Sequence, residues 1–410
     1  MQTISGGVCA PQGFRAGGIR CGIKASSQKR DLALIVSDRP CASAALFTTN
    51  RVKAASVLVS QERLASRRCR GVIVNSGNAN ACTGEAGLET ARRMAELAAE
   101  RLGLRPEEIA VASTGVIGTP LPIAPIAAGM AELAASLRAS EEGHDAALEA
   151  IMTTDTRKKG GALEVALEGV PIRIGAMVKG SGMIHPNMAT MLGFITTDAA
   201  VEPEALDQAL RRAVRGSFNR VSVDGDTSTN DMILIMANGA AGNPLIQARG
   251  ARFERFTQAL EALCAGLARS MARDGEGASR LMTVGVQGAA DEDAAALLAK
   301  AVASSSLVKA ACFGADANWG RVLCAMGYSG AAFDPAGVSV RFASAAGEVL
   351  VCAAGAAVPF SEERAKAILS QEEVEIRIDI ARESGPGGSA TVWGCDLTYD
   401  YVRINGDYRS

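Results

Sequence analysis

Histidine, aromatic residues and excess positive charge are scarce in this chain, and each shortage argues against a class of function. The 410 residues include two histidines, His144 and His185, so there is no HExxH zinc motif and a histidine-dependent catalytic triad is hard to build. Aromatic residues make up 4%, and 42 Lys and Arg face 44 Asp and Glu. Nucleic-acid binders usually combine a basic surface with stacking aromatics, so we expect no nucleic-acid partner.

Three ligand-binding motifs also fail in this sequence. There is no Gly-Lys dipeptide, which excludes a Walker A phosphate loop. Residues 180–182 lack the third glycine of a dinucleotide-binding turn. Residues 224–235 superficially resemble a calcium loop, but Thr229 stands where that loop needs glycine and Ile235 where it needs glutamate. We therefore expect neither a metal nor a bound cofactor.

Targeting and disulfide signals are equally sparse. Residues 1–5 have neither the basic nor the apolar segment of a signal peptide. The run 180–197 contains no Asp, Glu, Lys or Arg, but its glycines, Pro186 and Asn187 favour a buried loop and strand over a lipid-exposed helix. The ten cysteines form no Cys-x-x-Cys pair, and we expect buried free thiols. These features predict a cytoplasmic protein without a membrane partner.

The chain has enough apolar sequence for a large core. Hydrophobic residues make up 48%, and the length suits two or three domains, or one large body with an appendage. Apolar spacing and capping residues predict helices at 88–102, 142–153, 203–214, 253–273, 291–303 and after Ser361. Apolar or alternating runs predict a hairpin over 162–178 and strands at 31–36, 71–74, 231–237, 282–286, 338–342, 374–380 and 397–401. This mixture predicts an α/β (mixed α+β) fold.

The most informative segment is 179–192, which reads Lys-Gly-Ser-Gly-Met-Ile-His-Pro-Asn-Met-Ala-Thr-Met-Leu. On the residues alone, a glycine-rich buried turn followed by a strand would explain it. Lys179 argues for more, because a lysine at the head of a tract otherwise free of charge is costly to desolvate unless it is paired or used. The segment is therefore a candidate for chemistry as well as for structure.

This segment resembles the self-cleavage signature of the ornithine acetyltransferase family, also called glutamate N-acetyltransferase. The resemblance extends over almost the whole chain, and so many ordered motifs make chance similarity negligible. The further motifs are FTTNRV (47–52), VNSGNAN (74–80), STGVIG (113–118), MTTDT (152–156), VDGDTSTND (223–231) and GADANWGR (314–321).

The resemblance implies a fold and a division of the chain. The family is similar to the N-terminal-nucleophile aminopeptidases, whose fold is a layered sandwich of sheets and helices. By this resemblance we expect a main catalytic body at about 1–285. A smaller C-terminal α/β domain, 286–410, would contribute the chain end to the site.

The resemblance also implies self-cleavage between Ala189 and Thr190. The Thr190 hydroxyl would attack the Ala189 carbonyl, and water would open the resulting ester. The products would be an alpha chain, 1–189, and a beta chain, 190–410, which we expect to assemble as a heterotetramer of two copies of each. The new α-amino group, with an unperturbed pKa of about 8, would then act as the base that a histidine otherwise supplies.

The implied activity is acyl transfer in arginine biosynthesis. Thr190 would take the acetyl group of N2-acetyl-L-ornithine and pass it to L-glutamate. The oxyanion formed in each step needs hydrogen-bond donors, and by resemblance these are Thr114 and Gly115. Some family members also accept acetyl-CoA as a co-substrate, and some paralogues serve secondary metabolism with altered acceptors. No motif in this chain decides between these alternatives.

The family's substrate contacts map onto six positions. Of these, Lys179 suits a carboxylate and Glu276 an ammonium group, while Thr153 competes with Thr154 and Thr156 in the same run. The six are Thr153, Lys179, Thr190, Glu276, Asn405 and Ser410.

Two stretches depart from the family pattern. Ser279-Arg280 stands where the family more often has Thr-Lys. Gly406 follows Asn405 where alanine is common, and the chain closes on Ser410 where the family commonly has a second threonine. Serine keeps the hydroxyl, so the chain end retains its expected role in substrate binding.

Two other functions compete with acetyl transfer. An amidase or aminopeptidase of the same fold would need only a water placed at the acyl-threonine. An uncleaved paralogue could serve as a binding or scaffold protein, but it would need a damaged cleavage motif, and Ala189-Thr190 is intact. The tract 179–192 favours the transferase because it resembles the transferase signature.

Overall fold

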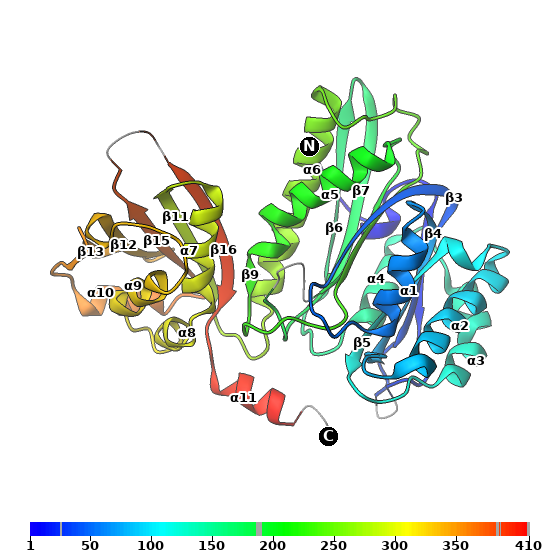
Figure 1. Ribbon diagram of the computed structural model, residues 1–410, viewed down its shortest axis with the longest axis horizontal. Helices are drawn as coiled ribbons and strands as arrows, with labels where there is room; N and C mark the ends of the chain where they lie inside the picture. Colours follow the sequence, from blue (N-terminus) through cyan, green and yellow to red (C-terminus); the bar gives the residue numbers. More distant parts are fainter. Residues whose placement is uncertain (25–26, 186–190, 383–384, 386, 408–410) are drawn as a thin grey trace. The chain divides into compact units, whose positions relative to one another are not determined.

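The computed structural model describes residues 1–24, 27–185, 191–382, 385 and 387–407, and the chain divides into two compact units. Unit 1 comprises Met1–Gly180, Asn187–Asn219 and Thr227–Leu267, and unit 2 comprises Ser181–Pro186, Arg220–Asp226 and Ala268–Ser410. In Figure 1 most of unit 1 runs from blue to green and most of unit 2 from yellow to red. Residues 268–285, which the sequence analysis placed with the main body, belong to unit 2.

Unit 1 is built on a nine-stranded mixed sheet. Eight strands follow the order β1-β6-β7-β8-β10-β3-β4-β5, and β2 pairs with β3. Two neighbouring pairs, β8 with β10 and β4 with β5, are parallel, while the others are antiparallel. The strands are β1 (Gln2–Ile4), β2 (Phe14–Ile19), β3 (Leu32–Phe47), β4 (Arg68–Asn78), β5 (Ile109–Val116), β6 (Lys159–Leu167), β7 (Val170–Lys179), β8 (Leu192–Thr197) and β10 (Met232–Ala237).

Apolar side chains cover both faces of this sheet. Along β3, Leu32 and Leu34 point into a core shared with α1, α2 and α3, whereas Ala33 and Ile35 point into a second core shared with α4. The alternation follows from the two-residue repeat of a strand. The helices of unit 1 are α1 (Ala55–Leu64), α2 (Gly84–Leu102), α3 (Ile123–Ser136), α4 (Glu141–Ile151), α5 (Pro203–Gly216) and α6 (Ala251–Arg273), whose last turns belong to unit 2.

Unit 2 contains a seven-stranded sheet in the order β14-β13-β12-β15-β11-β16-β9. Val284 and Ile376 of neighbouring strands share a buried core with Leu298 of α7. The strands are β9 (Val221–Ser222), β11 (Leu281–Ala289), β12 (Val338–Ser344), β13 (Gly347–Ala353), β14 (Ala356–Ala357), β15 (Glu373–Ile380) and β16 (Gly388–Cys395). The helices are α7 (Glu292–Ser304), α8 (Ser306–Phe313), α9 (Trp319–Gly327), α10 (Glu362–Leu369) and α11 (Tyr399–Gly406).

The predicted α/β class is confirmed, and most predicted elements occur within a few residues of the expected bounds. The hairpin turns at Glu168-Gly169 as expected, and the Ser361 side chain caps α10 by accepting the amide of Arg364. One prediction was wrong: residues expected as a strand at 397–401 enter the helix α11. Three alternating apolar residues were too few to identify a strand, and Tyr399 is 84% exposed, so the alternation marks no buried face.

Two further predictions concern cysteines and membrane helices. Seven of the ten cysteines are buried, but Cys82 and Cys324 are exposed. Among the described residues no single helix is long and apolar enough to cross a membrane; α7 and α8 pass that test only as a pair, bent by 58° at their junction. Both helices contribute buried side chains to the core of unit 2.

Candidate active site

Six of the nine predicted site residues lie in the described part of the chain. Ala189, Thr190 and Ser410 lie outside it. The remaining six fall into two groups, Thr114, Gly115, Thr153 and Lys179 in unit 1, and Glu276 and Asn405 in unit 2.

Lys179 is the centre of the group in unit 1. It is the last residue of β7 and is 8% exposed. Its Nζ donates to Thr153 Oγ1 at 2.8 Å and to Thr114 Oγ1 at 3.3 Å. Three residues that lie far apart in the sequence therefore meet through one ammonium group. Of the three candidate threonines at 153, 154 and 156, Thr153 accepts a hydrogen bond from Lys179.

Asp155 holds this arrangement together, and sequence reasoning had not singled it out. Its carboxylate accepts Lys159 Nζ at 2.6 Å, the Gly180 amide at 2.7 Å and the Thr153 amide at 3.1 Å. Burial alone would raise the pKa of this carboxyl, but the ammonium groups of Lys179 and Lys159 outweigh burial and hold the pKa well below its ordinary value. Asp155 is therefore a carboxylate at neutral pH and fixes both ends of the Thr153–Lys179 contact.

Thr114 and Gly115 lie near the end of β5, beside β4. Gly115 pairs with Gly77 and has a φ of 133°, and a Cβ at Gly115 would lie 2.3 Å from the Gly77 carbonyl carbon. Only glycine fits such an approach without moving the neighbouring strand. Asn230, also missed from the sequence, anchors this end of β5 by donating from Nδ2 to Ser113 O at 2.8 Å and to Ala79 O at 2.6 Å. A buried side-chain amide with two backbone acceptors keeps this end of the strand in place.

Asp231 is a second buried carboxyl that sequence reasoning missed. It directly precedes β10, whose Met232 amide donates to Met191 O at 3.1 Å. Among the described residues, Asp231 Oδ2 has no hydrogen-bond partner. Burial raises the pKa of the Asp231 carboxyl well above its ordinary value, and the Met191 amide offsets this only in part.

In unit 2, the predicted residues Glu276 and Asn405 are in contact. Asn405 lies on α11, and its Nδ2 donates to Glu276 Oε2 at 2.7 Å. The backbone amide of Glu276 donates to Ser181 O at 3.0 Å. A Cβ at Gly182 would lie 2.2 Å from Glu276 Cδ, so glycine there allows the backbone to approach the carboxyl group.

His144 is buried and His185 is half-buried, and burial lowers the pKa of each to about 4. His144 accepts the Val8 amide at Nδ1, and its ring lies so close to Gly7 and Gly160 that a Cβ at either position would approach it within 2.4 Å. His185 Nδ1 lies 3.0 Å from Ser222 Oγ. Each ring is therefore neutral at physiological pH.

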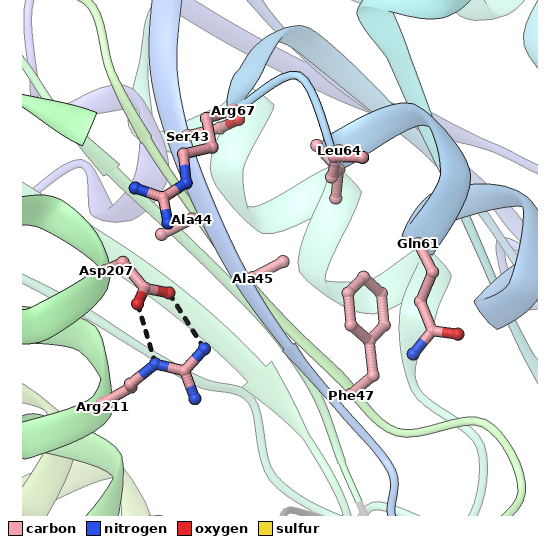
Figure 2. Close-up of a pocket in the computed structure, with 10 residues that line it drawn as sticks. Ser43, Ala44, Ala45, Phe47, Gln61, Leu64, Arg67, Asp207 and Arg211 are labelled. Carbon is pink, nitrogen blue, oxygen red and sulfur yellow. Dashed lines mark hydrogen bonds and ion pairs between the residues drawn. The ribbon is translucent and has the colours of Figure 1, made fainter. Parts of the chain in front are cut away.

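A cavity of about 300 Å³ lies in unit 1 between β3, α1 and α5 (Figure 2), but none of the predicted site residues lines it. Phe47 and Leu64 are among its lining residues. Asp207 and Arg211 on its wall form an ion pair with each other at 2.8 Å. Within the described ranges, no group of three His, Cys, Asp or Glu side chains is arranged to hold a metal ion.

Comparison with known proteins gives matches over nearly the whole sequence. Residues 15–410 match the ArgJ family. The chain is 53% identical to the arginine biosynthesis bifunctional protein ArgJ of Symbiobacterium thermophilum over 412 aligned residues, with 100% of both chains covered. It is 50% identical to the protein of the same name from Caldanaerobacter subterraneus subsp. tengcongensis over 410 residues, again with 100% of both chains covered.

Solved structures of similar proteins match parts of the chain. One is the arginine biosynthesis bifunctional protein ArgJ of Bacillus halodurans, which is 42% identical, with a TM-score of 0.49; the match covers 52% of this chain and 97% of that one. Another is the ornithine acetyltransferase of Mycobacterium tuberculosis, solved in complex with ornithine. It is 41% identical, with a TM-score of 0.43, and the match covers 46% of this chain and 99% of the other.

Proposed function

Because the chain belongs to the ArgJ family of arginine biosynthesis acetyltransferases, we propose that it moves the acetyl group of N2-acetyl-L-ornithine to L-glutamate through an acetyl-Thr190 intermediate. Before this, the chain cleaves itself between Ala189 and Thr190. The observation that carries the proposal is the meeting of Thr114, Thr153 and Lys179 in unit 1. A cation and two hydroxyl groups there can bind a substrate carboxylate and an oxyanion.

Maturation requires one bond exchange and one hydrolysis. Thr190 Oγ bonds to the Ala189 carbonyl carbon, the Ala189–Thr190 amide bond breaks, and the amide nitrogen takes the hydroxyl proton. Water then hydrolyses the ester, which releases the Ala189 carboxylate and restores the Thr190 hydroxyl. The free α-amine next serves as the base for Thr190, a device used by other enzymes with an N-terminal threonine. Both histidines have a pKa of about 4, which agrees with a base other than imidazole.

Acetyl transfer follows in two balanced steps. Thr190 Oγ bonds to the acetyl carbonyl carbon, its proton passes through the α-amine to the departing nitrogen, and ornithine leaves as an amine. The glutamate amine then attacks the acetyl ester, and its proton returns to Thr190 Oγ as N-acetylglutamate forms. Each step passes through a tetrahedral oxyanion that needs donors placed in advance.

Thr114 suits the role of oxyanion donor because of the bond that it already accepts. Its Oγ1 takes a hydrogen bond from Lys179 Nζ, and a hydroxyl that accepts such a bond keeps its own hydrogen for another acceptor. The Lys179 ammonium also polarises this hydroxyl towards donation. The Gly115 backbone amide would provide the second donor.

The charges of the two groups fit the substrates. Lys179, with Thr153 beside it, would bind the α-carboxylate that ornithine and glutamate share, since a buried ammonium is a strong partner for a carboxylate. Glu276, oriented by Asn405, would bind an ammonium group of ornithine. Ser410 would complete the substrate contacts from the chain end.

The two product chains would stay together after cleavage. Strands β7 and β8 lie on opposite sides of the cleavage point, yet they pair from Ile174 to Lys179. Strand β10 of the beta chain likewise pairs with β3 of the alpha chain. Both chains thus build one sheet, and separating them would expose a large apolar area. We further propose that two copies of each chain form a heterotetramer in the cytoplasm.

The alternative functions are less well supported. Membership of the ArgJ family does not favour an amidase or aminopeptidase, because the relatives are named as biosynthetic proteins. A binding or scaffold protein would remain one 410-residue chain, which mass spectrometry detects directly.

A steady-state assay tests the proposed reaction. Purified protein is given glutamate with either N-acetylornithine or acetyl-CoA as the donor, so that the assay also separates a one-donor from a two-donor enzyme. A covalent intermediate predicts parallel initial-rate plots and an acetylated Thr190 when glutamate is left out. Intersecting plots without acetylated Thr190 would contradict the intermediate and indicate direct transfer.

A further inference from the structure

Lys24 is a half-buried lysine that the proposed reaction has not yet used. It lies in a loop before β3 whose shape is set by the buried carboxylate of Asp31. That carboxylate accepts three backbone amides, those of Cys21 at 2.7 Å, Gly22 at 3.0 Å and Lys24 at 3.0 Å. Three convergent bonds to one charged group fix the direction in which the Lys24 side chain leaves the loop.

The Lys24 ammonium group lies beside the substrate-binding group of unit 1. Its Nζ donates to Met152 O at 2.8 Å and to Arg30 O at 3.0 Å. Met152 directly precedes Thr153, whose hydroxyl accepts Lys179 Nζ. Lys24 therefore holds one side of Thr153, while Asp155 holds the other by accepting the Thr153 amide.

The aliphatic part of the Lys24 side chain packs against Gly77, which lies beside Gly115. A Cβ at Gly77 would lie 2.7 Å from Lys24 Cγ, so the stem occupies the space that a larger residue would need. Gly77 has a φ of 97° and pairs with Gly115, which follows Thr114 in β5. One side chain thus extends from the strand beside the expected oxyanion donors to the backbone before Thr153.

The charges around Lys24 make this contact sensitive to pH. Burial is the main cause that lowers the pKa of the Lys24 ammonium to about 8. Asp31 and Asp155 favour the charged form, whereas Lys29 and Lys179 disfavour it. An exposed lysine would stay charged to about pH 10.

We propose that Lys24 is a positioning residue for acetyl transfer, which holds the Met152–Thr153 turn against Lys179 so that a substrate carboxylate meets both groups. The inference rests on the proposed function, because it names a further determinant of the same site. Lys24 acts through the Met152 carbonyl and does not contact the reacting atoms.

The main test replaces Lys24 with methionine, which keeps the stem against Gly77 and removes the ammonium. We expect the KM for N-acetylornithine and for glutamate to rise about tenfold, as for the loss of one charge-assisted hydrogen bond, while kcat changes less than about threefold. Lys24→Arg keeps a permanent charge and should restore part of the loss. The matched control is Lys29→Met in the same loop, since Lys29 is exposed and should leave both constants unchanged.

A pH profile separates positioning from a purely structural role. The Thr190 α-amine must lose its proton to act as a base, so it governs the acid side of kcat/KM. Lys24 loses its charge as the pH rises through about 8, so wild-type kcat/KM should fall on the alkaline side there. Arginine does not titrate in this range, and Lys24→Arg should lack that fall near pH 8.

The outcomes divide clearly. An unchanged KM in a folded, self-cleaved Lys24→Met variant, or an alkaline fall near pH 8 that persists in Lys24→Arg, overturns the inference. Should Lys24→Met fail to fold, the profile of Lys24→Arg decides by itself. Calorimetric titration with ornithine separates the two proposals: a wild type that binds ornithine about tenfold more tightly than Lys24→Met but transfers no acetyl supports the inference and overturns the proposed reaction. A wild type that neither binds ornithine nor transfers acetyl overturns both.

Discussion

Replacing Asp155 with asparagine should destabilise unit 1 more than the loss of any exposed ion pair would. Asp155 and Lys159 form a buried pair at 2.6 Å, with side chains 0% and 1% exposed. The substitution removes the negative charge but keeps the shape of the side chain. Lys159 would then be left as a buried ammonium without its counter-ion, and the Gly180 amide would lose a charged acceptor.

The expected magnitude follows from this geometry. Removing one partner of a buried ion pair typically costs about 3–5 kcal/mol, because the remaining charge stays desolvated. The low pKa of Asp155 fixes the sign of the pH dependence. A carboxyl with a folded pKa below its unfolded value of about 4 gives stability that is complete above pH 4 and is lost as the pH falls through the folded pKa. The full cost should therefore appear at pH 7.

Urea denaturation at pH 7, read from the transition of unit 1, measures this cost. The comparison is best made in the Thr190→Ala background, where we expect a single chain and cleavage does not complicate the unfolding. The matched control is Asp207→Asn, which breaks the more exposed pair with Arg211 and should cost less than about 1 kcal/mol. Adding Lys159→Met to Asp155→Asn should recover part of the loss, since the desolvated Lys159 ammonium is then removed as well. A cost below about 1 kcal/mol for Asp155→Asn would refute the reasoning.

Three further predictions concern the proposed reaction. Wild-type protein should appear in mass spectrometry as chains of 189 and 221 residues (410 minus 189), the second beginning Thr-Met-Leu-Gly, while Thr190→Ala should stay as one inactive chain; any other cut site would contradict the assigned motif. Thr114→Ala should lower kcat by about 10²–10³, as for the loss of one oxyanion donor, and a rate within about twofold of wild type would remove that hydroxyl from the mechanism. Lys179→Met should lower kcat/KM for both substrates by an amount equivalent to about 2–5 kcal/mol, and an unchanged value would leave Lys179 a structural role only.

Local patterns in the sequence predicted much of the fold. Strands such as β10 and β15 and helices such as α5 and α7 were visible because their apolar periodicity is strong and their ends carry capping or turn residues. The order of strands in the two sheets was not predictable. The parallel pairing of β8 with β10 joins segments separated by a helix and a long connection, and periodicity carries no information on which strands become neighbours.

The candidate site, too, was predictable from the sequence only in part. The family resemblance identified Thr114, Thr153 and Lys179 as site residues. In the structure, the Lys179 ammonium lies within hydrogen-bond distance of both threonines. The resemblance did not identify Lys24 or Asn230, which act on backbone carbonyls over 100 residues away in the sequence. A carbonyl acceptor is present at every position, so no residue type marks such a contact in advance.

If the chain cleaves itself as proposed, the site is divided between two product chains, and the sheet of unit 1 then matters for function. Thr114, Thr153 and Lys179 precede the expected cut, whereas Thr190 follows it. After the proposed cleavage, the pairing of β7 with β8 would still keep Lys179 opposite Leu192, two residues after Thr190. The backbone hydrogen bonds between β7 and β8 would then hold the two chains together in place of the covalent bond. Buried side chains such as Met177 and Phe194 would keep the two strands in one core. A substitution that weakens this pairing should therefore lower the stability of the cleaved protein more than the stability of the uncleaved chain.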